Sequence, residues 1–420
     1  MTIAILDTND CNLQLWHGDT HLRSPGYALL AGKQYRFGRE AREAARLQPR
    51  DINTRYWWQL STEPLQPALG PARHTADLVH AHLLELHREA GEPAEVLLAV
   101  SSSMQRDQLA LLLGIVQQCP FDAVGLVNRS VMLGSLHGTD EQLFHLEIQL
   151  HQALLSRLEH RAGEISLQRS VPLPGCGLLQ LQERLVETIA SAFIRQTRFD
   201  PRRKAATEQQ LYNSLPHALR ELGSGGDTNL EVSGYRARIN HGELLAAGQR
   251  LFDGVPKALE GARTQDLIID PVAALLPGLG EQFPGATLLA PDALHSAANR
   301  HLQQVVEREE ALSFITSLPC LERQSPATPE DTPQLQPEVL QETIEAPAPP
   351  SAAPLPAPTH LLQGSRAIAL AARATDLAPG CEFYLDERGW LLRGAIQGLR
   401  INGQSYHEGR ALRCGDELDT

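Results

Sequence analysis

A cluster of prolines divides the sequence into two parts of unequal size. Ten of the 28 prolines lie between Pro326 and Pro358. Proline cannot donate a backbone hydrogen bond and favours extended polyproline geometry, so this segment is expected to be a solvated spacer rather than part of a core. We therefore expect a body that ends near residue 320, a proline-rich linker over 321–360 and a small module over 361–420. A docking site for proline-recognising domains is the alternative interpretation of this composition.

Composition and charge narrow the class of protein. The chain has 420 residues, of which 42% are hydrophobic and 21% are charged, so it can form ordinary folded domains. Its formal net charge of −13 at pH 7 disfavours nucleic acid and anionic membrane surfaces as partners. We expect protein partners, bound by the body and the C-terminal module, and no nucleic acid.

The cysteines and the apolar runs bear on the location of the protein. The six cysteines are scattered, without a CxxC pair or a short Cys/His cluster, which predicts free thiols in a reducing cytoplasm and no bound metal. No N-terminal targeting segment is visible, and no apolar run approaches the roughly 20 residues of a membrane-spanning helix. The sequence thus predicts a cytoplasmic protein without a membrane span.

The spacing of apolar residues predicts an α/β body. A hairpin opens the chain between Thr2 and Trp16, and a second turn is expected at 31–33. Helical spacing of apolar residues occurs in three segments, 74–90, 105–116 and 178–193. Short, wholly apolar runs at 96–100 and 267–269 are typical of buried parallel strands.

A further hairpin begins near Gln142, and its first strand has a strictly alternating pattern. Apolar residues at 144, 146, 148 and 150 alternate with polar residues at 145, 147, 149 and 151. This alternation predicts a strand with one buried face. Because hairpin-led α/β halves start near Thr2 and near Gln142, the sequence suggests an internal duplication with a cleft between two lobes.

Four segments resemble the actin-like ATPase superfamily, and within it the nucleotide-binding part of the seventy-kilodalton, DnaK-type heat-shock chaperones. The segments are AILDTNDCNLQLW, VLLAVSSSMQRDQLALLLGIVQQCPFDAVGLVNRSVMLGSL, LFHLEIQLHQALLSRLE and IIDPVAALLPGLGEQFPGATLLAPDALHSAANRH. The resemblance covers about residues 1–315. It implies a two-lobed, duplicated ribonuclease-H-like fold, with lobe I over 1–175, lobe II over 176–320 and a nucleotide site between them.

The first hairpin keeps part of the family's phosphate-binding motif. Asp7 and Thr8 stand where the family has an acidic residue and its neighbour, but Asn9 stands at the family's glycine. Glycine is needed there because backbone N–H groups must approach phosphate oxygens without a Cβ clash. The resemblance makes Asp7, Thr8, Asn9 and Asn128 the candidate cofactor-binding residues, as vestiges of a nucleotide site.

The other family motifs are lost. His145 replaces an aspartate and residues 147–149 replace a glycine run. Arg129 replaces a glutamate associated with water and metal, and Asp270-Pro271 replaces a glycine pair beside the adenosine. We expect no catalytic residue, no metal site and no cofactor, with ATP and magnesium as the alternative. Asp7 with Glu147 could hold magnesium in such a fold, although a solvated carboxylate is the commoner case.

These losses favour a pseudo-ATPase that acts as a cytoplasmic scaffold, adaptor or chaperone-like protein rather than an enzyme. Two alternatives remain open: an active ATP-hydrolysing chaperone-like protein, and an actin-like component of a secretion or pilus assembly. A basic cluster, Arg198, Arg202, Arg203 and Lys204, is either a functional patch or a solvated loop between two helices.

The C-terminal module has short alternating runs separated by turn residues. Turns are expected at 387–389, 402–403 and 415–416, which predicts a small β meander. Its ending is similar to the last strands of forkhead-associated domains. That likeness implies an interaction module, although the loops that would hold a phosphothreonine have no counterpart here.

Overall fold

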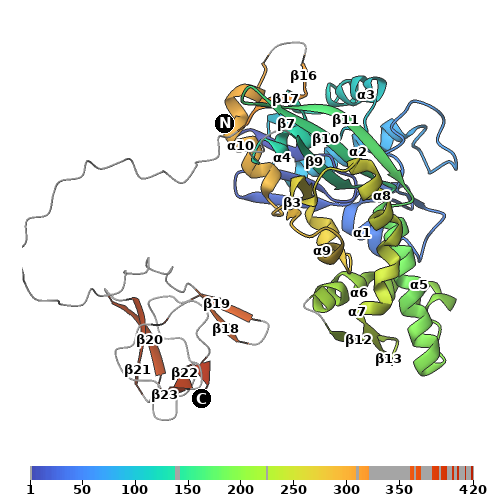
Figure 1. Cartoon of the computed structure of the whole chain (residues 1–420), viewed down its shortest axis with the longest axis vertical. Coiled ribbons are helices and arrows are strands. Elements are labelled where there is room, and N and C mark those ends of the chain that lie inside the picture. Colours follow the sequence, from blue (N-terminus) through green and yellow to red (C-terminus); the bar gives the residue numbers. More distant parts are fainter. Residues whose placement is uncertain are drawn as a thin grey trace, which may run out of the picture. The chain divides into compact units, whose positions relative to one another are not determined.

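The computed structural model describes residues 2–137, 142–223, 226–308 and 312–320, together with short strands between residues 360 and 419. The chain forms two compact units, Met1–Glu330 and Asp331–Thr420. The predicted linker lies outside the described residues up to residue 359. The α/β class is confirmed: the first unit combines two large mixed sheets with helices (Figure 1).

The first sheet has six strands in the order β16-β8-β7-β1-β2-β3. An antiparallel meander of β1, β2 and β3 forms one side, and β7, β8 and β16 continue it in parallel on the other side of β1. The predicted opening hairpin is therefore confirmed. The strands are β1 Ala4–Asp7, β2 Leu13–His17, β3 Thr20–Ser24, β7 Glu95–Val100, β8 Asp122–Asn128 and β16 Phe314–Ile315.

The second sheet repeats this arrangement in the order β15-β14-β9-β10-β11-β17. Strands β9, β10 and β11 form an antiparallel meander, and β14 and β15 continue in parallel beyond β9. The strands are β9 Gln142–Ile148, β10 Gln152–Arg161, β11 Glu164–Pro174, β14 Leu267–Ile269, β15 Thr287–Leu288 and β17 Ser317–Pro319. The two sheets thus share one strand order from hairpin to parallel strands.

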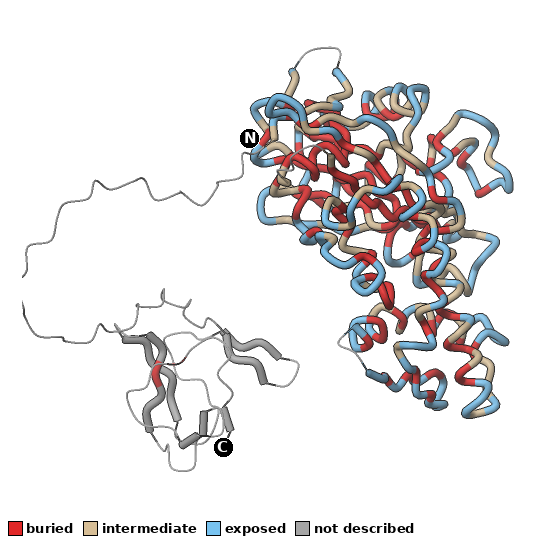
Figure 2. Tube along the Cα trace, viewed as in Figure 1, coloured by how far each residue is buried: buried red, intermediate tan, exposed pale blue. Residues whose placement is uncertain are grey.

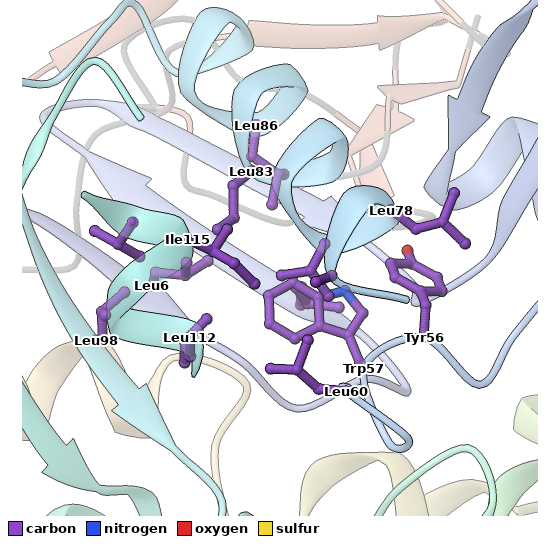
Figure 3. Packing of buried hydrophobic residues seen from close by; sticks show 14 of the residues in the cluster. Leu6, Tyr56, Trp57, Leu60, Leu78, Leu83, Leu86, Leu98, Leu112 and Ile115 are labelled. Carbon is purple, nitrogen blue, oxygen red and sulfur yellow. The ribbon is translucent and has the colours of Figure 1, made fainter. Parts of the chain in front are cut away.

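Helices cover the first sheet on both of its faces. On one face, α2 (Thr75–Glu89) and α3 (Arg106–Val116) bury leucines against the sheet, together with Tyr56 and Trp57 (Figure 3). On the other, α4 (Arg129–Gly134) and α10 (Ala293–Val305) belong to an apolar cluster that includes residues of both sheets. Burial of this cluster joins the two halves of the unit.

Two smaller groups of helices and strands extend from the sheets. Near the first sheet lie β4 Ala28–Ala31, β5 Gln34–Phe37, α1 Gly38–Ala44 and β6 Ile52–Asn53, with the predicted turn between β4 and β5. After the second meander come α5 Leu178–Thr197, α6 Ala205–Gly223, β12 Asp227–Val232, β13 Tyr235–Asn240 and α7 His241–Leu244. These last elements have a core of their own and group at one end of the unit (Figure 1). Helices α8 Gln249–Leu259 and α9 Leu279–Gln282 pack on the second sheet.

Burial corrects the expectation for β9. The alternating pattern predicted one buried face, but His145, Glu147 and Gln149 are also buried, at 0%, 0% and 5% exposure. Figure 2 shows that the buried residues concentrate along the strands of both sheets. The prediction was wrong because the polar face of β9 meets charged groups of other elements rather than solvent.

The second unit is described as short strands. The pairs β18 His360–Gln363 with β19 Arg366–Ala369, and β20 Cys381–Asp386 with β21 Gly389–Gly394, are antiparallel. Strand β22 Arg400–Ile401 pairs with both β23 Gln404–Ser405 and β24 Leu418–Asp419. Paired short strands thus lie where the β meander was predicted, while the likeness to forkhead-associated domains stays a prediction.

Candidate functional site

Charged side chains of the first unit meet where parallel strands of both sheets end. Asp7 is the last residue of β1, Arg129 follows the last residue of β8, and Asp270 follows β14. In α/β proteins the carboxyl ends of parallel strands are the usual place for ligand sites. We call Asp7, Asn9, Arg129, His145, Glu147 and Asp270 together the Arg129 network.

Arg129 is the centre of this network. Its Nε donates to Asp7 Oδ1 at 2.8 Å, and its Nη1 donates to the two carboxylate oxygens of Asp270 at 2.9 and 3.1 Å. Glu147 Oε2 lies 3.7 Å from the same Nη1. The Arg129 side chain is only 6% exposed, so one buried guanidinium joins carboxylates of both sheets.

Asp270 receives more polar contacts than the other two acids. His145 Nε2 lies 3.2 Å from Asp270 Oδ1, and Asn9 Nδ2 donates to Asp270 Oδ2 at 3.2 Å. The backbone N–H of Ile148 adds a longer contact of 3.4 Å. Asp270 is thus the best-satisfied carboxylate of the network.

The pKa values follow from this distribution of contacts. Burial opposes the charge of Asp270, but Arg129 and His145 outweigh it and hold its pKa below the ordinary value. Burial raises the pKa of Asp7 and of Glu147, and the attraction of Arg129, which lowers both pKa values, does not outweigh it. Asp7 Oδ2 and Glu147 Oε2 have no hydrogen-bond partner among the described residues.

Asp10 links the two hairpins through a separate contact. Its Oδ1 accepts a hydrogen bond from the Leu150 N–H at 2.8 Å, while Oδ2 has no hydrogen-bond partner among the described residues. Gly26 donates to the Asp10 carbonyl at 2.7 Å, and a Cβ at Gly26 would lie 2.9 Å from that oxygen. Burial raises the pKa of Asp10 to about 7, so its proton is held up to neutral pH.

A second layer of hydrogen bonds lies beside Glu147. Gln149 Nε2 donates to Glu147 Oε1 at 2.7 Å and to Ser101 Oγ at 2.6 Å. Ser101 follows the last residue of β7, so the end of a further parallel strand lies next to the Arg129 network. This layer orients Glu147 without adding a positive charge.

The structure divides the four candidate residues that the sequence suggested into two groups. Asp7 and Asn9 belong to the Arg129 network, with Asn9 Nδ2 also donating to the Ile148 carbonyl at 3.0 Å. Thr8 instead donates to the Ala99 carbonyl at 3.0 Å, which anchors the hairpin. Asn128 caps α4 by accepting from Val131 N–H at 3.1 Å, and it donates to Ser102.

The expectation that Asp7 is a solvated carboxylate is wrong. Asp7 is 1% exposed and forms an ion pair with Arg129. Sequence reasoning also missed that Arg129 pairs with Asp270 and that His145 and Glu147 face the same point. The signal that could have identified the network was a pattern of charges at the motif positions. Arg129 replaces an acid of the family there, while Asp7, Glu147 and Asp270 are acidic, so the arginine can neutralise them.

A cleft of about 580 Å³ opens above the network. Asp7, Asn9, Arg129 and Asp270 line it, together with residues of α1, α5 and α6. Its lining comes from both sheets and from both of the smaller groups of helices and strands. The network therefore forms part of the inner surface of this cleft.

No family model matches the chain, and no curated protein matches it. The chemistry of the site must be argued from the residues themselves.

A magnesium nucleotide fits this site poorly. Mg²⁺ prefers near-octahedral oxygen ligands and takes part of its shell from substrate phosphates. The carboxylates facing the cleft, Asp7 and Asp270, are instead hydrogen-bonded to Arg129. Within the described ranges, no group of three or more His, Cys, Asp or Glu side chains is placed to hold a metal ion.

Two further sequence expectations concern surfaces. None of the helices in the described part of the chain combines the length and apolar character needed to cross a membrane. In the basic cluster, Arg198 ends α5 in a left-handed conformation with φ of 62°, and Arg202 lies 3.6 Å from Asp200. Arg202 and Arg203 lie within the short 3-10 helix Pro201–Arg203, which connects α5 and α6.

Proposed function

We propose that the first unit is a two-lobed, actin-like, ribonuclease-H-like duplicated fold, with one lobe built on each of the two large sheets. The support is the shared strand order of the two sheets, each an antiparallel meander continued by parallel strands. A second support is the helix pair α4 and α10, whose apolar residues join the two sheets. Convergence of three strand ends on one point, below a cleft, accords with the DnaK-type resemblance.

The protein acts, in this proposal, as a non-hydrolysing scaffold or adaptor with chaperone-like ancestry. The single observation behind it is that Arg129 hydrogen-bonds the two carboxylates that face the cleft. A fixed cation in the protein replaces the need for a bound metal ion to neutralise these acids. The two halves are thereby held together by internal ion pairs, without a ligand whose turnover would change their arrangement.

Protein partners would bind the body and the C-terminal module in the cytoplasm. The thiols of Cys11, Cys119, Cys176 and Cys320 are free, which supports a reducing compartment. A constant arrangement of two lobes suits a protein that presents a fixed surface to partners.

An ATPase assay on the full chain tests the proposal. Purified protein with ATP and magnesium should release no phosphate above a buffer control, and Asp7→Asn should behave the same. Magnesium-dependent turnover that disappears in Asp7→Asn would contradict the proposal and favour an active ATP-hydrolysing chaperone-like protein.

A further inference from the structure

The cleft has a charge opposite to that of the whole chain. Its lining residues include five arginines and two aspartates, which leaves three positive charges. The complete chain has a formal net charge of −13. A concave, positively charged site in an acidic protein concentrates small anions, because the low-dielectric walls focus the field.

Four of these arginines are available to a ligand. Arg23 lies in β3, Arg39 and Arg42 lie in α1, and Arg220 lies in α6. Among the described residues, none of their guanidinium groups has an ion-pair or hydrogen-bond partner. The fifth, Arg129, is committed to the network.

The four arginines come from two parts of the unit, which meet where Gln209 of α6 donates to the Arg42 carbonyl of α1 at 3.2 Å. Three belong to the first half of the unit, whereas Arg220 belongs to the group of helices and strands from α5 to α7 that follows the second meander. A planar guanidinium binds phosphate or carboxylate with two parallel hydrogen bonds, so an anion can bridge arginines of the two parts.

One wall of the cleft is apolar. Leucines of α5 and α6 line it, and Leu181, Leu185, Leu215 and Leu219 are at most 6% exposed. Such recessed leucines can contact a small apolar body, whereas a docked helix requires broad exposed ridges. The volume of about 580 Å³ also lies within the range of small-molecule sites.

We propose that this cleft binds a small organic anion, an apolar body carrying a phosphate or carboxylate group, without a metal ion. The inference rests on the proposed function in one respect, namely that Arg129 keeps Asp7 and Asp270 from coordinating magnesium. The anionic group contacts Arg42 of α1 and Arg220 of α6, and the apolar body lies against the leucines of α5 and α6. Binding then strengthens the contact between the two halves that the Arg129 network already makes.

Calorimetric titration of the full chain in EDTA tests this inference. The probes are 1-naphthyl phosphate and 1-naphthoate, which distinguish the two anionic groups, with neutral 1-naphthol and inorganic phosphate as the separate parts. At least one naphthyl anion should bind about tenfold or more tightly than 1-naphthol and than inorganic phosphate. Its affinity should fall as sodium chloride is raised.

Single substitutions locate the site. Arg42→Gln and Arg220→Gln should each weaken the naphthyl anion about tenfold, since each removes a charged hydrogen-bond donor. Arg203→Gln, an exposed arginine outside the cleft lining, is the matched control and should bind like wild type. All three side chains are at least partly exposed, so folding should persist, which a melting curve checks.

Three results would overturn the inference: no naphthyl anion binds, 1-naphthol binds equally well, or Arg203→Gln weakens binding as much as Arg220→Gln. Binding of an acidic peptide in place of every small anion would also overturn it. None of these results touches the proposed function, which magnesium-dependent turnover would contradict.

Discussion

The hairpins β1–β2 and β9–β10 occupy equivalent positions in the two sheets but differ in their polar residues. The first contributes Asp7 and Asn9 at its tip, while the second contributes His145 and Glu147 from within the strand itself. Both are buried, and both face Arg129. The shared strand order thus depends on apolar residues, which leaves the residues at the strand ends free to change their chemistry.

Charge explains why the two sides are unequal. One guanidinium faces three carboxylates, and Asp270, on the side of the second sheet, has the most donors. Asp7, on the side of the first sheet, accepts from Arg129 and from the Asn9 N–H at 3.1 Å. We therefore expect the stability of the protein to depend more strongly on Asp270, on the side of the second sheet, than on Asp7, on the side of the first.

Removing Arg129 should have the largest effect on both sides. Arg129→Ala leaves three buried carboxylates without their cation, which should lower the free energy of unfolding by about 3–5 kcal/mol at pH 8. Urea denaturation measures this loss, with exposed Arg203→Ala as the control. Protonation of the acids relieves the penalty, so the difference from wild type should shrink at pH 5. A loss of stability that is equal at both pH values would contradict the network as drawn.

Asp270→Asn should destabilise the protein more than Asp7→Asn. The first change removes a charge that several donors stabilise and should cost about 3 kcal/mol. The second relieves part of the excess negative charge and should cost about 1–2 kcal/mol. Urea denaturation of the two variants at pH 7 gives the order, and the reverse order would show that the two sides were assigned wrongly.

Asp10 should make stability depend on pH. Its folded pKa of about 7 exceeds the ordinary value of 3.8, so between these values the folded state binds more protons and loses stability as pH rises. From pH 5 to pH 8 this loss should be on the order of 2 kcal/mol. Asp10→Asn, which keeps an acceptor for Leu150 N–H, should flatten the profile.

His82 acts in the opposite sense. Burial lowers its pKa to about 3, so its contribution to stability is lost as pH falls below 6.5. The effect is common to wild type and Asp10→Asn, and the difference between their unfolding curves therefore isolates Asp10. Parallel pH profiles for the two proteins would show that Asp10 is ionised in the folded state.

The smallest effect should come from the cap of α4. Asn128→Ala removes the acceptor for Val131 N–H and should cost about 1 kcal/mol. Asn128→Asp keeps that acceptor but loses the donor to Ser102, so it serves as the matched variant in the same denaturation series. Equal stability of Asn128→Ala and wild type would mean that the cap of α4 contributes nothing to the free energy of unfolding.

Sequence periodicity predicted the local elements well, because apolar spacing depends on which face of each strand or helix is buried. The hairpin of β1 and β2, the helix α2 and the parallel strand β7 all follow such patterns. The pattern of β9 was misleading, since polar residues also become buried where charges from distant segments meet. Arg129 and Asp270 are 141 residues apart, and no local pattern predicts their contact.

The effect of magnesium on ATP binding, measured by calorimetry on the full chain, tests the central claim most directly. Arg129 keeps the carboxylates at the cleft from acting as metal ligands, so adding magnesium should not strengthen ATP binding over that measured in EDTA. A gain of about tenfold or more with magnesium, lost in Asp7→Asn, would show that the carboxylates still organise a metal and that Arg129 does not replace it.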